Sequence, residues 1–207
     1  MAGERMTSTE IWLRLIHTGS LCGDVMLEAA ARLQKQEHLN VLVARNAGLT
    51  AKQVERFFAL DESELERSLM WLEQPGHHLL TANHPLYPPL LRTIPDYPGA
   101  LFIKGNPETL NTIQLAVVGS RAPSWYGERW GKILCEQLSQ SGFTITSGLA
   151  CGIDGVAHSA ALSVKGRSVA VLGNGLFSIY PRRHQALAMR LLYLLNRNTR
   201  TGSRRNI

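Results

Sequence analysis

Small residues and one arginine that could bind phosphate follow three apolar runs in the second half of the chain. Each run leads into a glycine-bearing turn, and a segment with a helical pattern follows. Backbone N–H groups at such turns and at helix N-termini bind phosphate oxygens, and a guanidinium adds a two-pronged contact. The three turns therefore predict a phosphate-binding surface. The residues that we expect to form it are Gly119, Ser120, Arg121, Ser124, Ser147, Gly148, Gly152, Asp154, Gly173 and Gly175.

Other side chains near these turns have alternative interpretations. Trp125 and Tyr126 could stack a nucleic-acid base, although aromatic residues at a helix start more commonly pack against the fold. We expect Asp154 to cap the next helix or to brace its loop. His158 lies one helical turn further on, so the two side chains could touch, but no serine nucleophile is placed beside them. We therefore expect no catalytic residues.

Strand and helix patterns alternate around these turns, which predicts an α/β domain with a parallel sheet and right-handed crossovers. Ligands of such sheets bind beyond the carboxyl ends of the strands. Each strand is apolar on both sides, as a sheet covered by helices requires. Gly142 and Gly166 are placed to end the first two helices. The expected strands are 114–118, 143–147 and 168–172, and the expected helices are about 125–141, 153–164 and 181–195.

Residues 1–75 read as a small module of short helices. Thr7–Glu10 and Thr50–Gln53 have the capping-box pattern, and Asp61–Glu64 caps a further helix. Similar bundles occur in sterile-alpha-motif and helix-hairpin-helix modules. A plain interaction or packing module is the alternative interpretation. The expected helices begin near residues 7, 24, 39, 50 and 61.

Residues 76–112 form a proline-rich join with short strands at about 78–82 and 100–104. We expect the α/β domain to occupy 113–195 and a basic tail to occupy 196–207. His77, His78 and His84 lie in the join, but no carboxylate or cysteine has ligand spacing nearby, so we expect surface or turn residues and no metal.

The charge is divided unevenly along the chain, which has a net charge of +6. Residues 1–75 hold eight Lys and Arg and eleven Asp and Glu, whereas residues 76–207 hold fourteen and five. No carboxylate side chain follows Asp154. A basic half beside a phosphate-binding surface indicates a polyanion as partner, and the alternative is a basic surface with no role in binding nucleic acid.

The remaining composition favours a cytoplasmic protein. The three cysteines have no CxxC pair and are odd in number, which argues against a disulfide framework or a zinc site. No apolar run reaches the ~18 residues of a membrane span, and no secretory signal begins the chain.

The three turns, in this order, resemble those of the DprA/Smf family of bacterial DNA-processing proteins. The similarity covers roughly Leu79 to Gln185. Tyr87-Pro88 and Leu101-Phe-Ile-Lys-Gly-Asn also resemble that family. The motifs are Val-Val-Gly-Ser-Arg-x-x-Ser-x-Tyr-Gly from Val117, Ser-Gly-Leu-Ala-x-Gly-Ile-Asp-x-x-Ala-His from Ser147, and Ala-Val-Leu-Gly-x-Gly-Leu-x-x-Ile-Tyr-Pro from Ala170.

The resemblance implies an extended Rossmann-like domain that binds single-stranded DNA without a cofactor and is not an enzyme. It also implies protection of incoming strands during natural transformation and competence, and assistance in loading the RecA recombinase for DNA recombination. By motif, the loops Gly119–Arg121 and Ser147–Gly152 would contact backbone phosphate.

The chain departs from the family pattern after Leu187. There the family continues for a further half-domain with a Ser-Glu segment and a Phe-x-Arg-Asn-Arg motif, whereas this chain has Met189–Asn196 and an Arg-, Asn- and Thr-rich tail. We expect a C-terminally truncated, partial sheet with an open edge and a weakened homodimer. One alternative is a phosphoribohydrolase-like enzyme, although the Pro-Gly-Gly-x-Gly-Thr loop of that group is missing. The other is a non-functional fragment.

Overall fold

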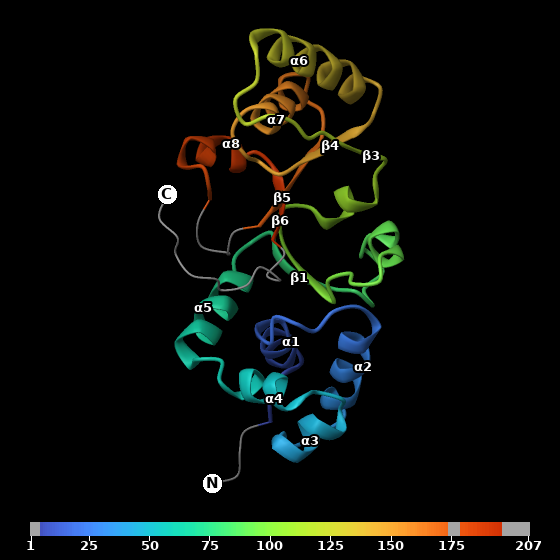
Figure 1. Cartoon of the computed structure of the whole chain (residues 1–207), viewed down its shortest axis with the longest axis vertical. Coiled ribbons are helices and arrows are strands. Elements are labelled where there is room, and N and C mark those ends of the chain that lie inside the picture. Colours follow the sequence, from blue (N-terminus) through green and yellow to red (C-terminus); the bar gives the residue numbers. More distant parts are fainter. Residues whose placement is uncertain (1–4, 174–178, 196–207) are drawn as a thin grey trace. The chain divides into compact units, whose positions relative to one another are not determined.

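The computed structural model describes residues 5–173 and 179–195, and the side chains up to residue 191 (Figure 1). These residues divide into two compact units. One unit holds residues 5–75 and 79–101, and the other holds residues 76–78 together with the described residues from 102 onward.

The first unit is built on five helices, as the sequence predicts (Figure 1). Six consecutive residues of helix α1, from Ile11 to Ile16, are buried, and the helix packs against α2, α4 and α5. Leu15, Leu33 and Phe57 are fully buried, so the helices share one apolar core. The helices are α1 (Ser8–His17), α2 (Gly23–Gln34), α3 (Val41–Asn46), α4 (Ala51–Phe58) and α5 (Glu62–Leu72).

Of the three expected caps, the helix starts confirm one complete capping box and, at Thr7, the N-cap alone, since Glu10 Oε1 accepts from Arg14. The Thr7 hydroxyl accepts a hydrogen bond from the Glu10 N–H at 3.2 Å. Thr50 and Gln53 form the complete reciprocal capping box. Asp61 occupies the N-cap position of α5, but its side chain caps no backbone N–H and accepts from the Ser63 hydroxyl instead. A neighbouring side-chain donor thus replaces the expected backbone donor.

Two buried tyrosines fix the proline-rich join: Tyr87 bonds within the join, and Tyr97 ties it to helix α2. The Tyr87 hydroxyl donates to the Pro98 carbonyl at 2.6 Å, and the Tyr97 hydroxyl donates to Asp24 Oδ1 at 2.7 Å. Burial raises the pKa of both phenols, so they stay neutral donors at physiological pH.

The three histidines of the join differ in solvent exposure. His84 is exposed in a turn and His78 is exposed on a strand, as expected, whereas His77 is buried. Placing His77 on the surface was wrong, because the residue is only 8% exposed at the start of the strand His77–Thr81. Within the described residues no three His, Cys, Asp or Glu side chains gather as a metal site.

One sheet of six strands has the order β1-β2-β6-β5-β4-β3. Strands β3, β4, β5 and β6 run parallel, which confirms the predicted parallel sheet, while β2 pairs antiparallel with β6. The strands are β1 (His77–Thr81), β2 (Ala100–Lys104), β3 (Gln114–Ala116), β4 (Thr144–Ser147), β5 (Ser168–Leu172) and β6 (Leu192–Leu195).

The predicted helix over 181–195 is wrong. A 3-10 turn (Arg182–His184) and the short helix α8 (Gln185–Ala188) are followed by strand β6. The run Leu192–Leu195 is apolar throughout, and such a short run fits a buried strand as well as a helix. Here β6 lies between β5 and β2, so its backbone groups pair on both sides.

Two long helices, α6 (Trp125–Gln140) and α7 (Ile153–Ser163), pack against each other and against β4 (Figure 1). Cys135 of α6, Ile145 of β4 and Ala157 of α7 meet in an apolar cluster. The small alanines of α7 let the helix approach the sheet closely. This layer fixes the ends of the strands from which the glycine turns emerge.

The two expected helix-ending glycines behave differently. Gly142 has φ +94° after α6, as predicted. After α7, however, Lys165 takes the left-handed position with φ 59°, and Gly166 follows it. A Cβ on Gly166 would lie 2.7 Å from the Ser139 Cβ, so this glycine is needed for close packing and not for a helix end.

Strand β3 ends the sheet and is poorly covered. Ile113, Leu115 and Val118 around it are 74%, 36% and 81% exposed. The expectation that helices cover both faces of every strand is therefore wrong for β3, and an apolar edge remains open within the described residues. No helix in the described part of the chain is both long and apolar enough to cross a membrane.

Candidate functional site

The first glycine turn presents an exposed cation. Gly119, Ser120 and Arg121 are all exposed at the end of β3. The Ser120 hydroxyl accepts from the Ala122 N–H at 3.1 Å, which tightens the turn. No carboxylate of the described residues forms an ion pair with Arg121. A guanidinium held in a tight turn without an acidic partner is suited to an anionic ligand.

Two glycines hold this turn against the start of α7. The Ile153 N–H donates to the Ser120 carbonyl at 3.1 Å. A Cβ on Gly119 would lie 2.7 Å from Ile153 Cγ1, and a Cβ on Gly152 would lie 2.2 Å from the Ser120 carbonyl oxygen. Gly152 also has φ +79°. Glycine is thus required at both positions because the first turn and the start of α7 pack so closely. The first two turns are therefore joined.

Buried polar side chains brace the second turn. The carboxylate Oδ2 of Asp154 accepts from the N–H groups of Gly148 and Ala150, both at 3.2 Å. The Ser147 hydroxyl donates to the Val117 carbonyl at 2.6 Å. Asp154 therefore braces its loop, one of the two roles expected for it, and Ser147 ties β4 to β3. The phosphate prediction had treated the Ser147 hydroxyl and the Gly148 N–H as free donors, but these contacts occupy both, so the two residues shape the loop.

The third turn is described only in part. Gly173 is exposed, and Gly175 lies outside the described residues. Ser147 pairs in register with Ala170, so the second and third turns leave the same edge of the sheet. A Cβ on Gly148 would lie 3.9 Å from the Val171 carbonyl oxygen, which shows how near the two turns are.

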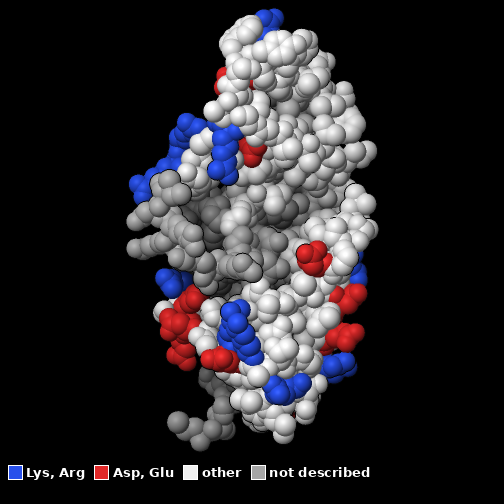
Figure 2. Space-filling model, viewed as in Figure 1, with Lys and Arg blue, Asp and Glu red and all other residues white. Residues whose placement is uncertain are grey.

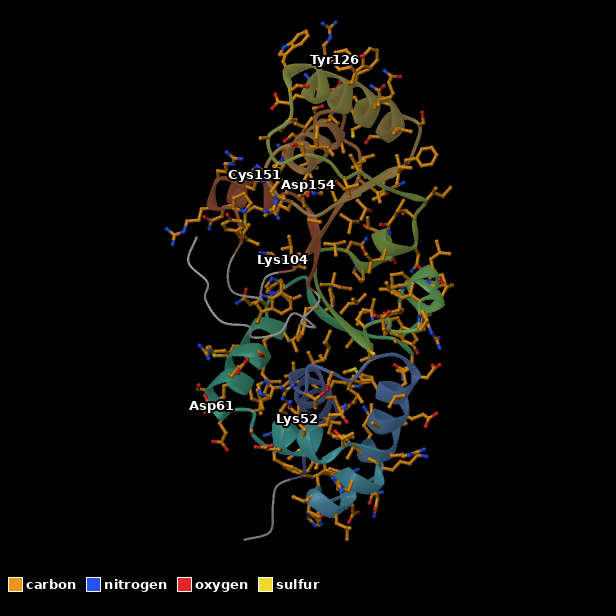
Figure 3. The ribbon with its side chains drawn as sticks, in the orientation of Figure 1. Lys52, Asp61, Lys104, Tyr126, Cys151 and Asp154 are labelled. Atoms are coloured by element: carbon orange, nitrogen blue, oxygen red, sulfur yellow. The ribbon has the colours of Figure 1, made fainter. Side chains whose placement is uncertain are left out.

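Trp125 and Tyr126 are not packed into the core. They are 70% and 65% exposed at the start of α6, whose N-cap Ser124 accepts from the Gly127 N–H at 3.2 Å. The Arg129 guanidinium lies 5.3 Å from the Trp125 ring centre. Figure 3 shows Tyr126 on the outward side of the helix. The packing interpretation is therefore wrong here, and the rings are accessible to a ligand.

His158 is buried and has a partner that the sequence did not reveal. Its Nδ1 lies 2.7 Å from the Ser168 Oγ, which itself donates to the Ile145 carbonyl at 2.8 Å. His158 Nδ1 must therefore carry the proton, and Nε2 is left buried without a partner among the described residues. Burial lowers the pKa of His158 to about 4. Because neither side chain is accessible, this serine–histidine pair is structural.

A basic hollow lies beside Gly152, between α6, α7 and α8. Its volume is about 1100 Å³, and residues of all three helices line it. Figure 2 shows Lys and Arg side chains gathered over α8. The sequence analysis did not place these cations at the site, because α6 and the residues around α8 are distant in the sequence. Its charged residues are Glu128, Arg129, Lys132, Arg183 and Arg190.

A helical module followed by a Rossmann-like α/β domain with glycine turns at its strand ends defines the class of protein. Residues 78–195 match the family model described as DNA recombination-mediator protein A, and residues 6–70 match the SMF/DprA SAM domain. The chain belongs to the DprA/Smf family. Its N-terminal module is accordingly a SAM domain.

Relatives and solved structures agree with this assignment. The chain is 57% identical over 187 residues to Protein Smf of Escherichia coli, covering 90% of this chain and 50% of that protein. It is 34% identical to DNA processing protein DprA of Bacillus subtilis, over 69% of this chain and 47% of the relative. The chain thus spans about half the length of these relatives.

The solved structure of DprA from Streptococcus pneumoniae matches with a TM-score of 0.71 and 29% identity, over 97% of this chain and 70% of that one. DNA processing protein A from Helicobacter pylori, whose structure was solved for its single-stranded DNA binding mode, matches with a TM-score of 0.52 and 25% identity. That match covers 58% of this chain and 55% of that one.

Proposed function

We propose that this chain binds the phosphate backbone of single-stranded DNA through the joined turns Gly119–Arg121 and Ser147–Gly152. The observation that carries the proposal is the exposed Arg121, which pairs with no carboxylate of the described residues, in a turn held against Gly152. Such a cation forms charge-assisted bonds to phosphate oxygens, which are stronger than neutral hydrogen bonds. The turns are shaped before any ligand arrives, so little ordering opposes binding.

Single-stranded DNA is favoured over duplex by the shape of the surface. The turns present neither a helix nor a two-stranded ribbon that would enter a major groove. The exposed Trp125 and Tyr126 offer rings on which unpaired bases stack. The single-stranded DNA binding mode of the H. pylori protein supports the same ligand for this fold.

In the cell, we propose that the chain protects incoming single strands and assists loading of RecA in natural transformation and recombination. Membership of a family of recombination mediators supports this role, acting in the cytoplasm and without enzymatic activity. A homodimer is part of the same proposal. Because the chain spans about half of its relatives, each of these activities needs its own test on this chain.

The test is the affinity of the full chain for fluorescent oligo-dT, compared between the wild type and Arg121→Ala. One charge-assisted phosphate contact contributes roughly 1.5–3 kcal/mol, so the variant should bind about ten- to a hundredfold more weakly. Lys165→Asn is the matched control. It removes one exposed cation of the same unit, and asparagine tolerates the φ of 59° at that position. Circular dichroism checks that both variants fold.

Equal losses in Arg121→Ala and Lys165→Asn would show a diffuse basic surface and contradict the proposed site. Duplex of the same length is the second comparison. Binding of duplex as tightly as oligo-dT would refute the preference for single strands.

A further inference from the structure

The basic hollow is a second surface, besides the two joined turns, whose lining residues suit a ligand. Four of its described lining residues are cations, and Glu128 is the one carboxylate among them. Arg129, Arg183 and Arg190 are exposed, and none of them forms an ion pair with a carboxylate of the described residues. Lys132 lies 3.8 Å from Glu136 and is partly neutralised. Three uncompensated guanidinium groups around one concave surface favour an anion.

The hollow combines this charge with an aromatic rim and an apolar floor. The exposed Trp125 indole stands at one side, and Val156, Ala160 and Leu187 line the interior. A volume of about 1100 Å³ is slightly above the usual range for a small-molecule site and has room for a base, a sugar and a phosphate. An anion that also carries a flat ring system matches all three features.

Two contacts hold the 3-10 turn Arg182–His184, which carries Arg183 and precedes α8, against α7. His184 Nδ1 lies 2.9 Å from the Leu149 carbonyl oxygen of the second turn. A Cβ on Gly155 would lie 2.7 Å from His184 Cε1, so the imidazole packs directly on the α7 backbone. Arg183, which precedes His184, is therefore held beside α7. The hollow is a built feature of the fold, and α8 is not a loose segment.

The hollow is also continuous with the site of the proposed function. Gly152 lines the hollow and touches the Ser120 carbonyl of the first turn. To reach Arg183 and Arg129, a strand bound at Arg121 therefore needs to extend only past Gly152.

We propose that the basic hollow is a nucleotide subsite, in which Arg183 and Arg190 bind a phosphate and Trp125 stacks the attached base. The inference rests on the proposed function for its main source of ligand, a nucleotide further along the bound strand. A free nucleoside monophosphate has the same chemistry and is the second source. The subsite lengthens the path of the strand beyond the joined turns.

The experiment uses the full chain, a series of oligo-dT lengths and free dTMP. Arg183→Gln and Arg190→Gln should each weaken long oligo-dT about tenfold, and Trp125→Ala should weaken it about fivefold or more. The same variants should leave the shortest binding oligo-dT unchanged. Arg121→Ala should weaken every length, and the control Lys165→Asn should change affinity by less than about twofold. The indole N–H signal of Trp125, assigned by its loss in Trp125→Phe, reports dTMP in the hollow.

Four results decide the matter. Length-dependent losses in the hollow variants support the subsite. Losses in Arg121→Ala alone, with the hollow variants equal to Lys165→Asn, overturn the subsite and leave the proposed function intact. The chain could instead fail to bind oligo-dT while its Trp125 signal shifts with dTMP, and shifts only when Arg183 is present. That result supports the subsite and refutes the proposed function. A chain that responds to neither ligand overturns both.

Discussion

Acid should destabilise the α/β unit through one buried histidine. In the folded chain the pKa of His158 is lowered from 6.5 to about 4 by burial, while in the unfolded chain it returns to the ordinary value. Between these values the unfolded state binds a proton that the folded state does not. The stability that the neutral imidazole confers is therefore complete above pH 6.5 and is lost as the pH falls towards 4.

The magnitude follows from the size of the shift. Each pKa unit corresponds to about 1.4 kcal/mol, so the loss should be about 2 kcal/mol at pH 5 and about 3 kcal/mol at pH 4. His158→Asn removes the titrating group and places its amide nitrogen where Nδ1 donates to Ser168. The variant will be less stable at pH 7 because its side chain is smaller, but its stability should fall less steeply with acid.

The stability of this unit alone is measured by urea unfolding at pH 7, 5 and 4. Hydrogen exchange of peptides from residues 144–163 serves as the readout. His78→Asn is the matched control, because it replaces an exposed histidine of the same unit. If the wild type and His158→Asn lost stability in parallel between pH 7 and pH 4, the assignment of a neutral, buried imidazole would be refuted.

Three substitutions and one change of salt concentration test the loops and their ligand. Gly152→Ala should lower both stability and DNA affinity, since its Cβ would lie 2.2 Å from the Ser120 carbonyl oxygen; a binding isotherm and melting curve equal to wild type would contradict the contact. Ser124→Ala removes the cap of α6 and should cost about 1 kcal/mol in urea unfolding, with no loss being the contrary result. Asp154→Asn weakens the brace on two N–H groups and should speed their hydrogen exchange, whereas unchanged rates would show that the brace is dispensable. If three to four phosphates are contacted, the logarithm of affinity should fall against the logarithm of salt concentration with a slope of about −2 to −3, and an isotherm unaffected by salt would exclude the electrostatic contacts.

The sequence predicted elements whose signals are local. The capping box at Thr50–Gln53, the left-handed Gly142 and the strand 168–172 all rest on a few neighbouring residues, and the structure confirms each of them. The order of the three turns was enough to indicate the family as well. These features depend on backbone geometry and short-range hydrogen bonds, which the residue types report directly.

Features that depend on tertiary contacts could not be predicted in this way. Leu192–Leu195 forms a strand because β2 and β5 supply partners on both sides, and nothing within the run itself distinguishes a strand from a helix. Gly166 had the residue type of a helix end, but the demand on it comes from Ser139 of another helix. The cations of the hollow come from α6 and from the residues on either side of α8, which only the folded chain brings together.

The brace that Asp154 forms on the second turn has a kinetic consequence. Because the Asp154 carboxylate already holds the N–H groups of Gly148 and Ala150, the loop is held in one shape without a ligand. If single-stranded DNA binds at Arg121 as proposed, the strand meets a preformed surface, and association should run at the rate set by diffusion and charge steering, without a slower loop-closing phase. Salt should then act mainly on the association rate, and loss of a phosphate contact should appear mainly as a shorter residence time of the strand.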